Sequence, residues 1–182
     1  MRDADLPSLS ATVSTYNDFG PTAPPTKAAP YDLETRGAFV VEAGGDPVGT
    51  VSWYPKRWGP NESSSCTRIG VLLLPEHRGR GIGTTAQREL VTLLFRHTAV
   101  HRVEAYTDVR NIAEQRALEK AGLMREGVVR GSQFRDGRYN DGYLYGILRT
   151  DLDDACPGVS ADLRFMGARH RFVGAVEATG QP

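Results

Sequence analysis

A glycine-rich basic loop stands near the middle of the sequence, between an apolar run and a helical pattern. The loop, residues 78–83, reads RGRGIG. The first backbone N–H groups of a helix have no partners within the helix, and the helix dipole makes that end partly positive. Because glycine has no Cβ, an anion can approach the backbone closely at Gly81 and Gly83. Arg78 and Arg80 add positive charge, so the loop predicts a cradle for a pyrophosphate.

This loop differs from two common phosphate-binding sequences. It lacks the GxxxxGK[ST] pattern of a P-loop, so neither the phosphate-binding Lys nor the Mg²⁺-binding hydroxyl is in place. It is also not a GxGxxG motif followed by an acidic residue about 20 residues further on, as in a dinucleotide-binding fold. Taken alone, the loop is also compatible with a surface turn that binds nothing.

Strand patterns and helix patterns alternate on either side of the loop. Strands appear as short apolar or alternating runs bounded by turn residues, whereas helices repeat apolar residues every three or four positions. The order is β-β-β-α-β-α-β-β, which predicts an α/β (α+β) domain with helices on the faces of a mixed sheet. The expected strands are residues 38–43, 48–53, 67–74, 101–109, 128–134 and 143–148, and the expected helices begin at Thr84 and after Asn111.

Turn residues and apolar runs mark the ends of the strands. Glycine accepts positive φ, so residues 44–46 (GGD) and 136–137 (DG) are predicted turns. Residues 54–65 are a predicted loop. The run at residues 67–74 (TRIGVLLL) predicts a strand buried on both faces. In residues 101–109, Arg102, Glu104, Tyr106 and Asp108 share one face of the strand.

The second helix carries signals at both of its ends. Asn111 precedes it and Glu114 stands at its third position, which predicts a capping box with Asn in place of Ser or Thr. Gly122 follows the last turn and predicts a left-handed C-terminal cap.

The chain divides into three stretches of different character. Its 182 residues suit one domain. Residues 1–37 are polar, Pro-rich and predicted to be partly helical, and residues 38–150 carry the strong periodicity. Residues 151–182 are a predicted tail, disordered except for some order around residues 163–172.

Composition excludes several classes of protein. The formal net charge is zero, which argues against a nucleic-acid binder held by bulk charge. No apolar run approaches the ~18 residues of a membrane span, and the N-terminus lacks the apolar core of a signal peptide, so we expect a cytoplasmic protein. Cys66 and Cys156 show neither metal-site nor CxxC spacing, so we expect two reduced thiols and no metal.

Three stretches of the sequence resemble one family, the GNAT superfamily of N-acetyltransferases. Arg78-x-x-Gly81-x-Gly83 resembles its R/Q-x-x-G-x-G/A signature, and residues 74–79 (LPEHRG) resemble its L-x-P-E-x-R-G lead-in. Residues 111–123 (NIAEQRALEKAGL) resemble its N-x-x-[AS]-x-x-L-[YL]-E-K-x-G-F element. Residues 101–105 and 141–151 look like the Rim-type (RimJ/RimL-like) branch, named for ribosomal-protein N-terminal acetyltransferases.

The resemblance implies a fold, an activity and a binding site. The fold is the GNAT fold, with a mixed, mostly antiparallel central sheet and helices on both faces. The activity is transfer of an acetyl group from acetyl-CoA (coenzyme A) to a primary amine on a small molecule or peptide, with a homodimer as one possible assembly. The implied cofactor contacts are Leu72, Leu73, Leu74, Arg78, Gly79, Arg80, Gly81, Ile82, Gly83, Thr84 and Asn111.

The sequence departs from the family pattern at several positions. The family's acid, often Tyr, is Leu118, and the Ser that is common in the Rim-type branch is Glu114. The strand at residues 67–74 has no acidic residue to act as a base. Residues 2–9 resemble the segment that follows the first strand in relatives, so either that strand is absent or the true start lies upstream. These departures motivate a rival hypothesis, a coenzyme A-binding sensor or interaction module without catalysis.

A base matters because an amine of pKa about 10 is neutral in only about one molecule in 10³ at pH 7. The candidates are Glu104, Tyr106, Glu62 and Asp141, each of which is also compatible with a structural role. Acceptor candidates are a protein N-terminus, a polyamine, an amino acid and an amine-bearing antibiotic. Aromatic residues either line the acceptor groove or belong to the core: Trp53, Tyr54, Trp58, Tyr139, Tyr143 and Tyr145.

Overall fold

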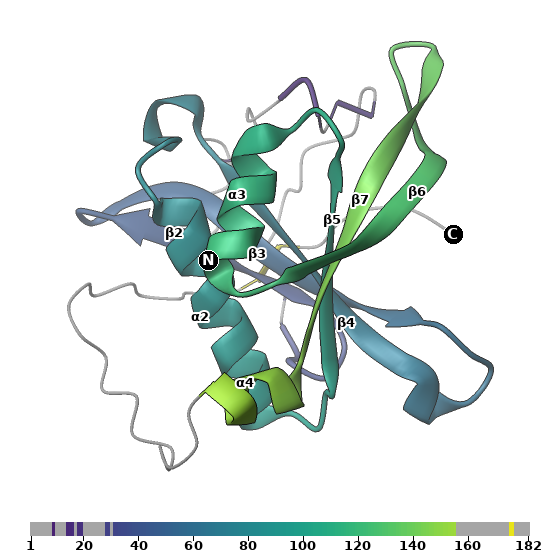
Figure 1. Ribbon diagram of the computed structural model, residues 1–182. Helices are drawn as coiled ribbons and strands as arrows, with labels where there is room; N and C mark the ends of the chain where they lie inside the picture. The colour runs from purple at the N-terminus through teal and green to yellow at the C-terminus, as the bar shows by residue number, and fades with distance from the viewer. Residues whose placement is uncertain are drawn as a thin grey trace.

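The computed structural model describes residues 9, 14–16, 18–19, 28–29, 31–155 and 175–176. A six-stranded sheet of order β2-β3-β4-β5-β7-β6 forms its centre (Figure 1). Neighbouring strands are antiparallel except β4 and β5, which are parallel. The mixed, mostly antiparallel sheet is therefore confirmed. Its strands are β2 (Gly37–Ala43), β3 (Asp46–Arg57), β4 (Ser65–Leu73), β5 (Arg102–Asp108), β6 (Met124–Arg135) and β7 (Arg138–Leu148).

Helices α2 (Ile82–His97) and α3 (Ile112–Ala121) pack on one face of this sheet (Figure 1). Apolar residues at helical spacing on α2, such as Leu90 and Leu94, are fully buried. They join one hydrophobic core with Val103 on β5 and with residues of β3, β4, β7 and α3. The opposite face of β5 carries the polar side chains that include Glu104 and Asp108.

Both predicted hairpin turns are confirmed. Gly44 and Gly45 have φ of +67° and +95° between β2 and β3, and Asp136 and Gly137 have φ of 52° and 70° between β6 and β7. Two consecutive left-handed residues match the right-handed twist of the flanking strands.

The loop predicted at residues 54–65 is wrong at both of its ends. Strand β3 runs on to Arg57, where it pairs with Ser65 of β4, and a short 3-10 helix η2 (Glu62–Ser64) fills much of the connection. The Pro and Gly residues of this stretch suggested a loop. Pro55 is tolerated because β2 ends opposite Trp53, so no neighbouring strand needs an N–H group at position 55.

Helix α4 (Arg149–Ala155) follows β7 without a break and crosses the domain edge predicted at residue 150. A separate two-stranded sheet joins β1 (Ala28–Ala29) to β8 (Ala175–Val176). Within the described ranges, no helix is long and apolar enough to cross a membrane.

Most of the predictions for residues 1–37 and 151–182 fall outside the described residues. This applies to the helical content of the first segment, to the disorder predicted for the tail and to the order predicted around residues 163–172.

Candidate functional site

Strands β4 and β5 lie side by side for only part of their length. Residues 67–69 pair with residues 103–105, after which the strands run on separately to Leu73 and Asp108. The N–H of Leu74 donates to Val48 O at 2.9 Å, so strand alternation turns the backbone groups of Val71 and Leu73 toward the opening. Two strand edges that do not pair with each other therefore face each other inside the sheet.

This divergence corrects one prediction. Residues 67–74 were expected to form a strand buried on both faces, yet only Cys66, Thr67 and Ile69 of β4 are buried. The residues of β4 from Gly70 to Leu73 are half-buried, because β5 no longer covers them. The apolar run therefore borders a gap in the pairing of the sheet, where no strand bonds to this side of β4.

The glycine-rich loop lies at the wide end of this opening. Strand β4 leads through a short 3-10 helix, η3 (Pro75–His77), into the loop and then into α2. Gly79 and Gly81 are left-handed, with φ of +73° and +79°, and a Cβ on either would meet no atom within 4 Å. Since the first bond of α2 joins Thr85 N–H to Gly81 O, the N–H groups of residues 82–84 have no helical partner.

No side chain caps this end of α2, and its first turn holds no acidic residue. The guanidinium of Arg78 donates from Nε to Leu73 O at 3.0 Å, which ties the loop to the end of β4. Arg80 is exposed beside it. The predicted anion cradle is thus an open, partly positive helix end that borders the β4–β5 opening.

Asn111 stands across the opening, where β5 turns into α3. Its Oδ1 accepts the N–H of Glu114 at 3.3 Å, which confirms the predicted helix cap. The reciprocal half of the capping box does not form, because the N–H of Asn111 donates to Asp108 O at 2.9 Å. The Asn111 Nδ2 group makes no hydrogen bond to another described residue, and the Glu114 carboxyl group is not used in a cap.

The Glu114 carboxyl group lies partly buried between α3 and α2. Burial raises its pKa to about 7, and a contact with Gln87 of α2 only partly offsets this. Gln87 is fully buried, and its amide makes no hydrogen bond of ordinary length. Near neutral pH, Glu114 therefore holds a proton for much of the time.

Glu104 is fully buried on the other face of β5 and is fully engaged. Its Oε1 accepts from Arg68 Nε at 2.9 Å, and its Oε2 accepts from Trp58 Nε1 at 3.0 Å and from Arg102 at 3.4 Å. Burial by itself would raise the pKa of this carboxyl, but the charge and hydrogen bonds of Arg68 hold it below its usual value. The alternative interpretation of Glu104, an ion-pair partner of Arg102, is confirmed.

Two further candidates contact strand β6. The Tyr106 hydroxyl bonds to the Ser132 hydroxyl, and Asp141 Oδ1 accepts the N–H of Gly131 at 2.7 Å. Both contacts fall where the register between β6 and β7 shifts, so that residues 130–132 bulge opposite a single residue of β7. Asp141 and Tyr106 thus hold the bulge in place.

The last candidate, Glu62, is exposed at the start of η2 in the β3–β4 connection. The structure therefore brings Glu104 and Tyr106 onto one face of β5, whereas Glu62 and Asp141 come from separate elements.

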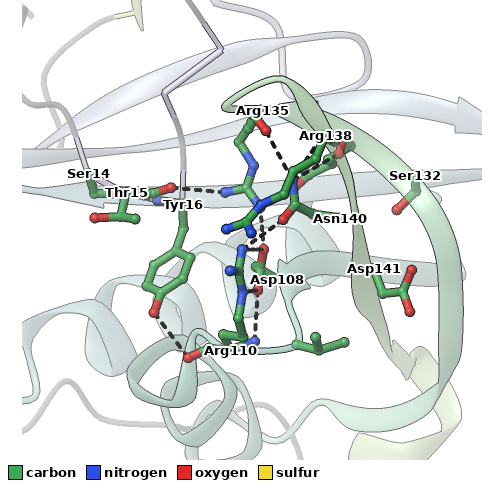
Figure 2. Close-up of polar contacts among 12 residues, drawn as sticks. Ser14, Thr15, Tyr16, Asp108, Arg110, Ser132, Arg135, Arg138, Asn140 and Asp141 are labelled. Atoms are coloured by element: carbon green, nitrogen blue, oxygen red, sulfur yellow. Dashed lines mark hydrogen bonds and ion pairs between the residues drawn. The ribbon is translucent and has the colours of Figure 1, made fainter.

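Sequence reasoning missed a polar cluster centred on Asp108, at the end of β5 (Figure 2). Asp108 is buried and accepts from Arg110 Nε at 3.1 Å and from the Arg135 guanidinium. Burial alone would raise its pKa, but the hydrogen bonds from Arg110 and Arg135 lower the pKa to about 2. The sequence did place an acidic residue, Asp108, on a mostly buried strand, which indicates a need for a buried partner. It did not identify that partner, because Arg135 lies far away in the sequence.

Of the aromatic residues expected near the acceptor, the structure places two in the core. Trp53 and Tyr145 are 1% and 0% exposed and belong to the core. Tyr54, Trp58 and Tyr139 are exposed, and Trp58 donates to the buried Glu104 carboxylate.

The family model described as Acetyltransferase (GNAT) domain matches residues 2–124. The Probable N-acetyltransferase YjcK of Bacillus subtilis (strain 168) is 36% identical over 104 residues, covering 57% of this chain and 56% of the relative. The chain thus spans about half the length of the curated relatives that it matches. It belongs to the GNAT acetyltransferase family.

Solved structures show the same fold. A ribosomal-protein-alanine N-acetyltransferase from Brucella melitensis matches with a TM-score of 0.55 and 24% identity, covering 62% of this chain and 68% of that one. The spermidine/spermine N-acetyltransferase SpeG from Vibrio cholerae matches with a TM-score of 0.58 and 23% identity, covering 66% and 69%. In the part of the chain that the structure describes, no group of three or more His, Cys, Asp or Glu side chains is placed to hold a metal ion.

Proposed function

We propose that the protein transfers an acetyl group from acetyl-CoA directly to a primary amine. The observation that carries this proposal is the opening between β4 and β5, which leads at its wide end to the uncapped N-terminus of α2. Acetyl-CoA combines a pyrophosphate with an extended, amide-bearing arm that ends in a thioester. These two parts match the two sets of backbone groups that no strand or helix of the fold pairs, the β4 side of the opening and the first N–H groups of α2.

The pyrophosphate would be held by the N–H groups of residues 82–84, with Arg80 adding positive charge. The arm would run along the open edge of β4, in hydrogen-bonding reach of the backbone of Val71 and Leu73. Across the opening, the unused Nδ2 group of Asn111 would donate to an amide carbonyl of the arm.

In the transfer, the amine nitrogen bonds to the acetyl carbonyl carbon and the C–S bond breaks. The carbonyl oxygen gains negative charge on the way, which a backbone N–H can stabilise. The N–H of Leu73 is better placed for this than that of Leu74, because the N–H of Leu74 already donates to Val48 O. No covalent carrier is proposed: burial, with the nearby Glu104 carboxylate, raises the pKa of the Cys66 thiol to about 11, which keeps it protonated.

The attacking amine must lose a proton, which costs about 4 kcal/mol at pH 7. Three of the four candidate bases are engaged: Glu104 with Arg68, Tyr106 with Ser132 and Asp141 with Gly131. Glu62 makes no hydrogen bond or ion pair to any other described residue. We therefore keep Glu62 as the candidate base, acting directly or through water.

The departing thiolate must gain a proton, and Glu114 is the proposed donor. It lies one helical turn beyond the cap residue Asn111, and burial raises its pKa to about 7. A carboxylic acid with a pKa near the working pH suits this task. Leu118, the position at which the family often has Tyr, is fully buried in the core and has no proton to give.

The proposed acceptors are the four classes of primary amine named above. The structural neighbours differ in this respect, since one is named for ribosomal-protein alanine and the other for spermidine and spermine. Exposed Tyr54 and Trp58 beside the Glu104 cluster offer an aromatic surface that suits an amine-bearing group.

A panel of these amines incubated with acetyl-CoA tests the proposal. The release of free coenzyme A thiol should rise above the rate of acetyl-CoA hydrolysis with at least one acceptor, and mass spectrometry should find the acetylated amine. Binding of coenzyme A without turnover on any amine would favour the rival, a non-catalytic coenzyme A-binding module, which Leu118 motivates. Glu114→Gln should lower kcat, whereas Glu119→Gln on the same helix is the matched control.

A further inference from the structure

Asp108 fixes the turn between β5 and α3 through both its backbone and its side chain. Its carbonyl oxygen accepts the N–H of Asn111 at 2.9 Å and the amide of Gln115 at 3.4 Å. Its carboxylate accepts the backbone N–H of Arg110 at 2.8 Å. Three hydrogen bonds to Asp108 therefore fix the turn that leads to Asn111.

The same carboxylate is held from the other side by elements distant in the sequence (Figure 2). Arg135 at the end of β6 donates to Asp108 and also to Thr15 O at 3.3 Å. Arg110 donates to Asn140 Oδ1 of β7 at 2.7 Å, and its carbonyl accepts from the Tyr16 hydroxyl at 3.2 Å. Arg110 and Arg135 both donate to the Asp108 carboxylate, and through them the β6–β7 hairpin and residues 15–16 are connected to the β5–α3 turn.

This cluster resists partial change because its ion pair is buried. The side chains of Asp108 and Arg135 are 0% and 2% exposed. Removing one partner of a buried pair leaves the other charge uncompensated, so the remaining groups must move to find new partners. The Asp108 carboxylate holds the short turn of residues 109–111 through its hydrogen bond to the Arg110 N–H. If the carboxylate shifts, we expect this turn to shift with it.

We propose that Asp108 is a positioning residue for acetyl-CoA binding, and that Arg135 sets the affinity for acetyl-CoA through Asp108 and Asn111. Arg135 lies on the hairpin, not at the β4–β5 opening or the glycine-rich loop. The inference rests on the proposed function in one respect, the contact of Asn111 with the arm of acetyl-CoA. A hydrogen bond weakens steeply with distance and angle, so a small shift of the turn is enough to lose that contact.

Calorimetric titration of the full chain with coenzyme A and with acetyl-CoA tests the proposal. Arg135→Gln and Asp108→Asn should each raise Kd by about five- to tenfold, the range expected for losing one well-placed hydrogen bond. The matched control is Arg149→Gln, which removes another well-bonded arginine at the opposite end of β5. It should lower Tm yet leave Kd unchanged. If Arg135→Gln folds and binds coenzyme A as tightly as the wild type, the proposal is wrong.

A double-mutant cycle separates positioning from general destabilisation. In the Asn111→Ala background, Arg135→Gln should raise Kd no further, because the contact that it positions is already absent. Equal effects in both backgrounds would overturn the coupling. If Asn111→Ala itself leaves Kd unchanged, Asn111 does not contact the arm of acetyl-CoA and this inference is wrong. Binding of the pyrophosphate at the glycine-rich loop is tested separately by a substitution at Gly81.

A milder variant keeps the test open if the buried substitutions prevent folding. Tyr16→Phe removes a single exposed hydrogen bond to Arg110 and should fold normally. We expect a rise in Kd of about twofold, again abolished by Asn111→Ala. Unchanged affinity in this variant would count against the role of residues 15–16.

Discussion

The ring of Tyr106 occupies the space that a side chain at position 142 would need. A Cβ built on Gly142 would lie 1.8 Å from both Cζ and Oη of Tyr106. From β5 the ring therefore crosses β7 at Gly142 and reaches Ser132 in the bulge of β6. One side chain links three strands on the polar face of the sheet, and it does so only because residue 142 has no side chain.

Gly142→Ala should destabilise the fold by about 1–3 kcal/mol, the usual cost of overpacking. Urea unfolding measures this as a lower midpoint with an unchanged slope. In a Tyr106→Ala background the same substitution should cost much less, because the clash is gone. An equal cost in the two backgrounds would show that the ring does not lie against residue 142.

Gly81→Glu should abolish measurable binding of coenzyme A, since a carboxylate would stand among the N–H groups that we propose bind the pyrophosphate. Glutamate also strains a left-handed residue by about 1–2 kcal/mol, so a control with the same strain is needed. Gly44→Glu provides it, because Gly44 has φ of +67° and nothing within 4 Å of its Cβ position. Calorimetry should find normal affinity in the Gly44 variant. Normal affinity in both variants would place the phosphates elsewhere.

Glu114 should make folding stability fall as pH rises. Its pKa is about 7 in the folded chain, against 4.5 when unfolded, so between these values the folded state holds the extra proton. Stability therefore decreases from pH 4.5 to pH 7 and levels off above pH 7, by about 3 kcal/mol in total. Glu114→Gln removes this dependence, so the variant should match the wild type at pH 4.5 and exceed it at pH 8.

The same proton should appear in the kinetics. If Glu114 protonates the thiolate, wild-type kcat falls above pH 7 as the acid form is lost, and Glu114→Gln lacks this limb. If kcat of Glu114→Gln has the same pH dependence as the wild type, another group protonates the thiolate, even if the stability prediction is confirmed.

Arg149→Gln should lower stability by about 2–4 kcal/mol without affecting cofactor affinity. The guanidinium donates to the carbonyl oxygens of Phe95, Thr98 and Val100, which lie at and beyond the C-terminal end of α2. Without it these partly buried acceptors lose their partners. Thermal unfolding measures the loss; Arg96→Gln, on an exposed position of α2, should show almost none.

The sequence was most informative where a local rule acts within a few residues. The turns at residues 44–46 and 136–137, the cap at Asn111 and the left-handed end at Gly122 follow from short-range chemistry, and each is present. The glycine-rich loop before α2 could also be predicted, because glycine is the residue that best leaves the backbone open at a helix start. The end of β3 was predicted too early: the strand continues through Pro55, which pairs with Thr67 of β4 and has no strand on its other side because β2 ends opposite Trp53.

By itself the sequence determined the order of the six central strands and the two helices between them, the cap of α3 and the family motifs, since these depend on periodicity and on the conformational limits of glycine, proline and asparagine. It placed the start of α2 at Thr84, whereas the helix begins at Ile82. Only the tertiary structure decided what the charged groups do. Glu104 meets Arg68, Asp108 meets Arg135 and Glu114 meets Gln87 across gaps of many residues. Burial and partners, which set each pKa, arise only when separate strands and helices pack together.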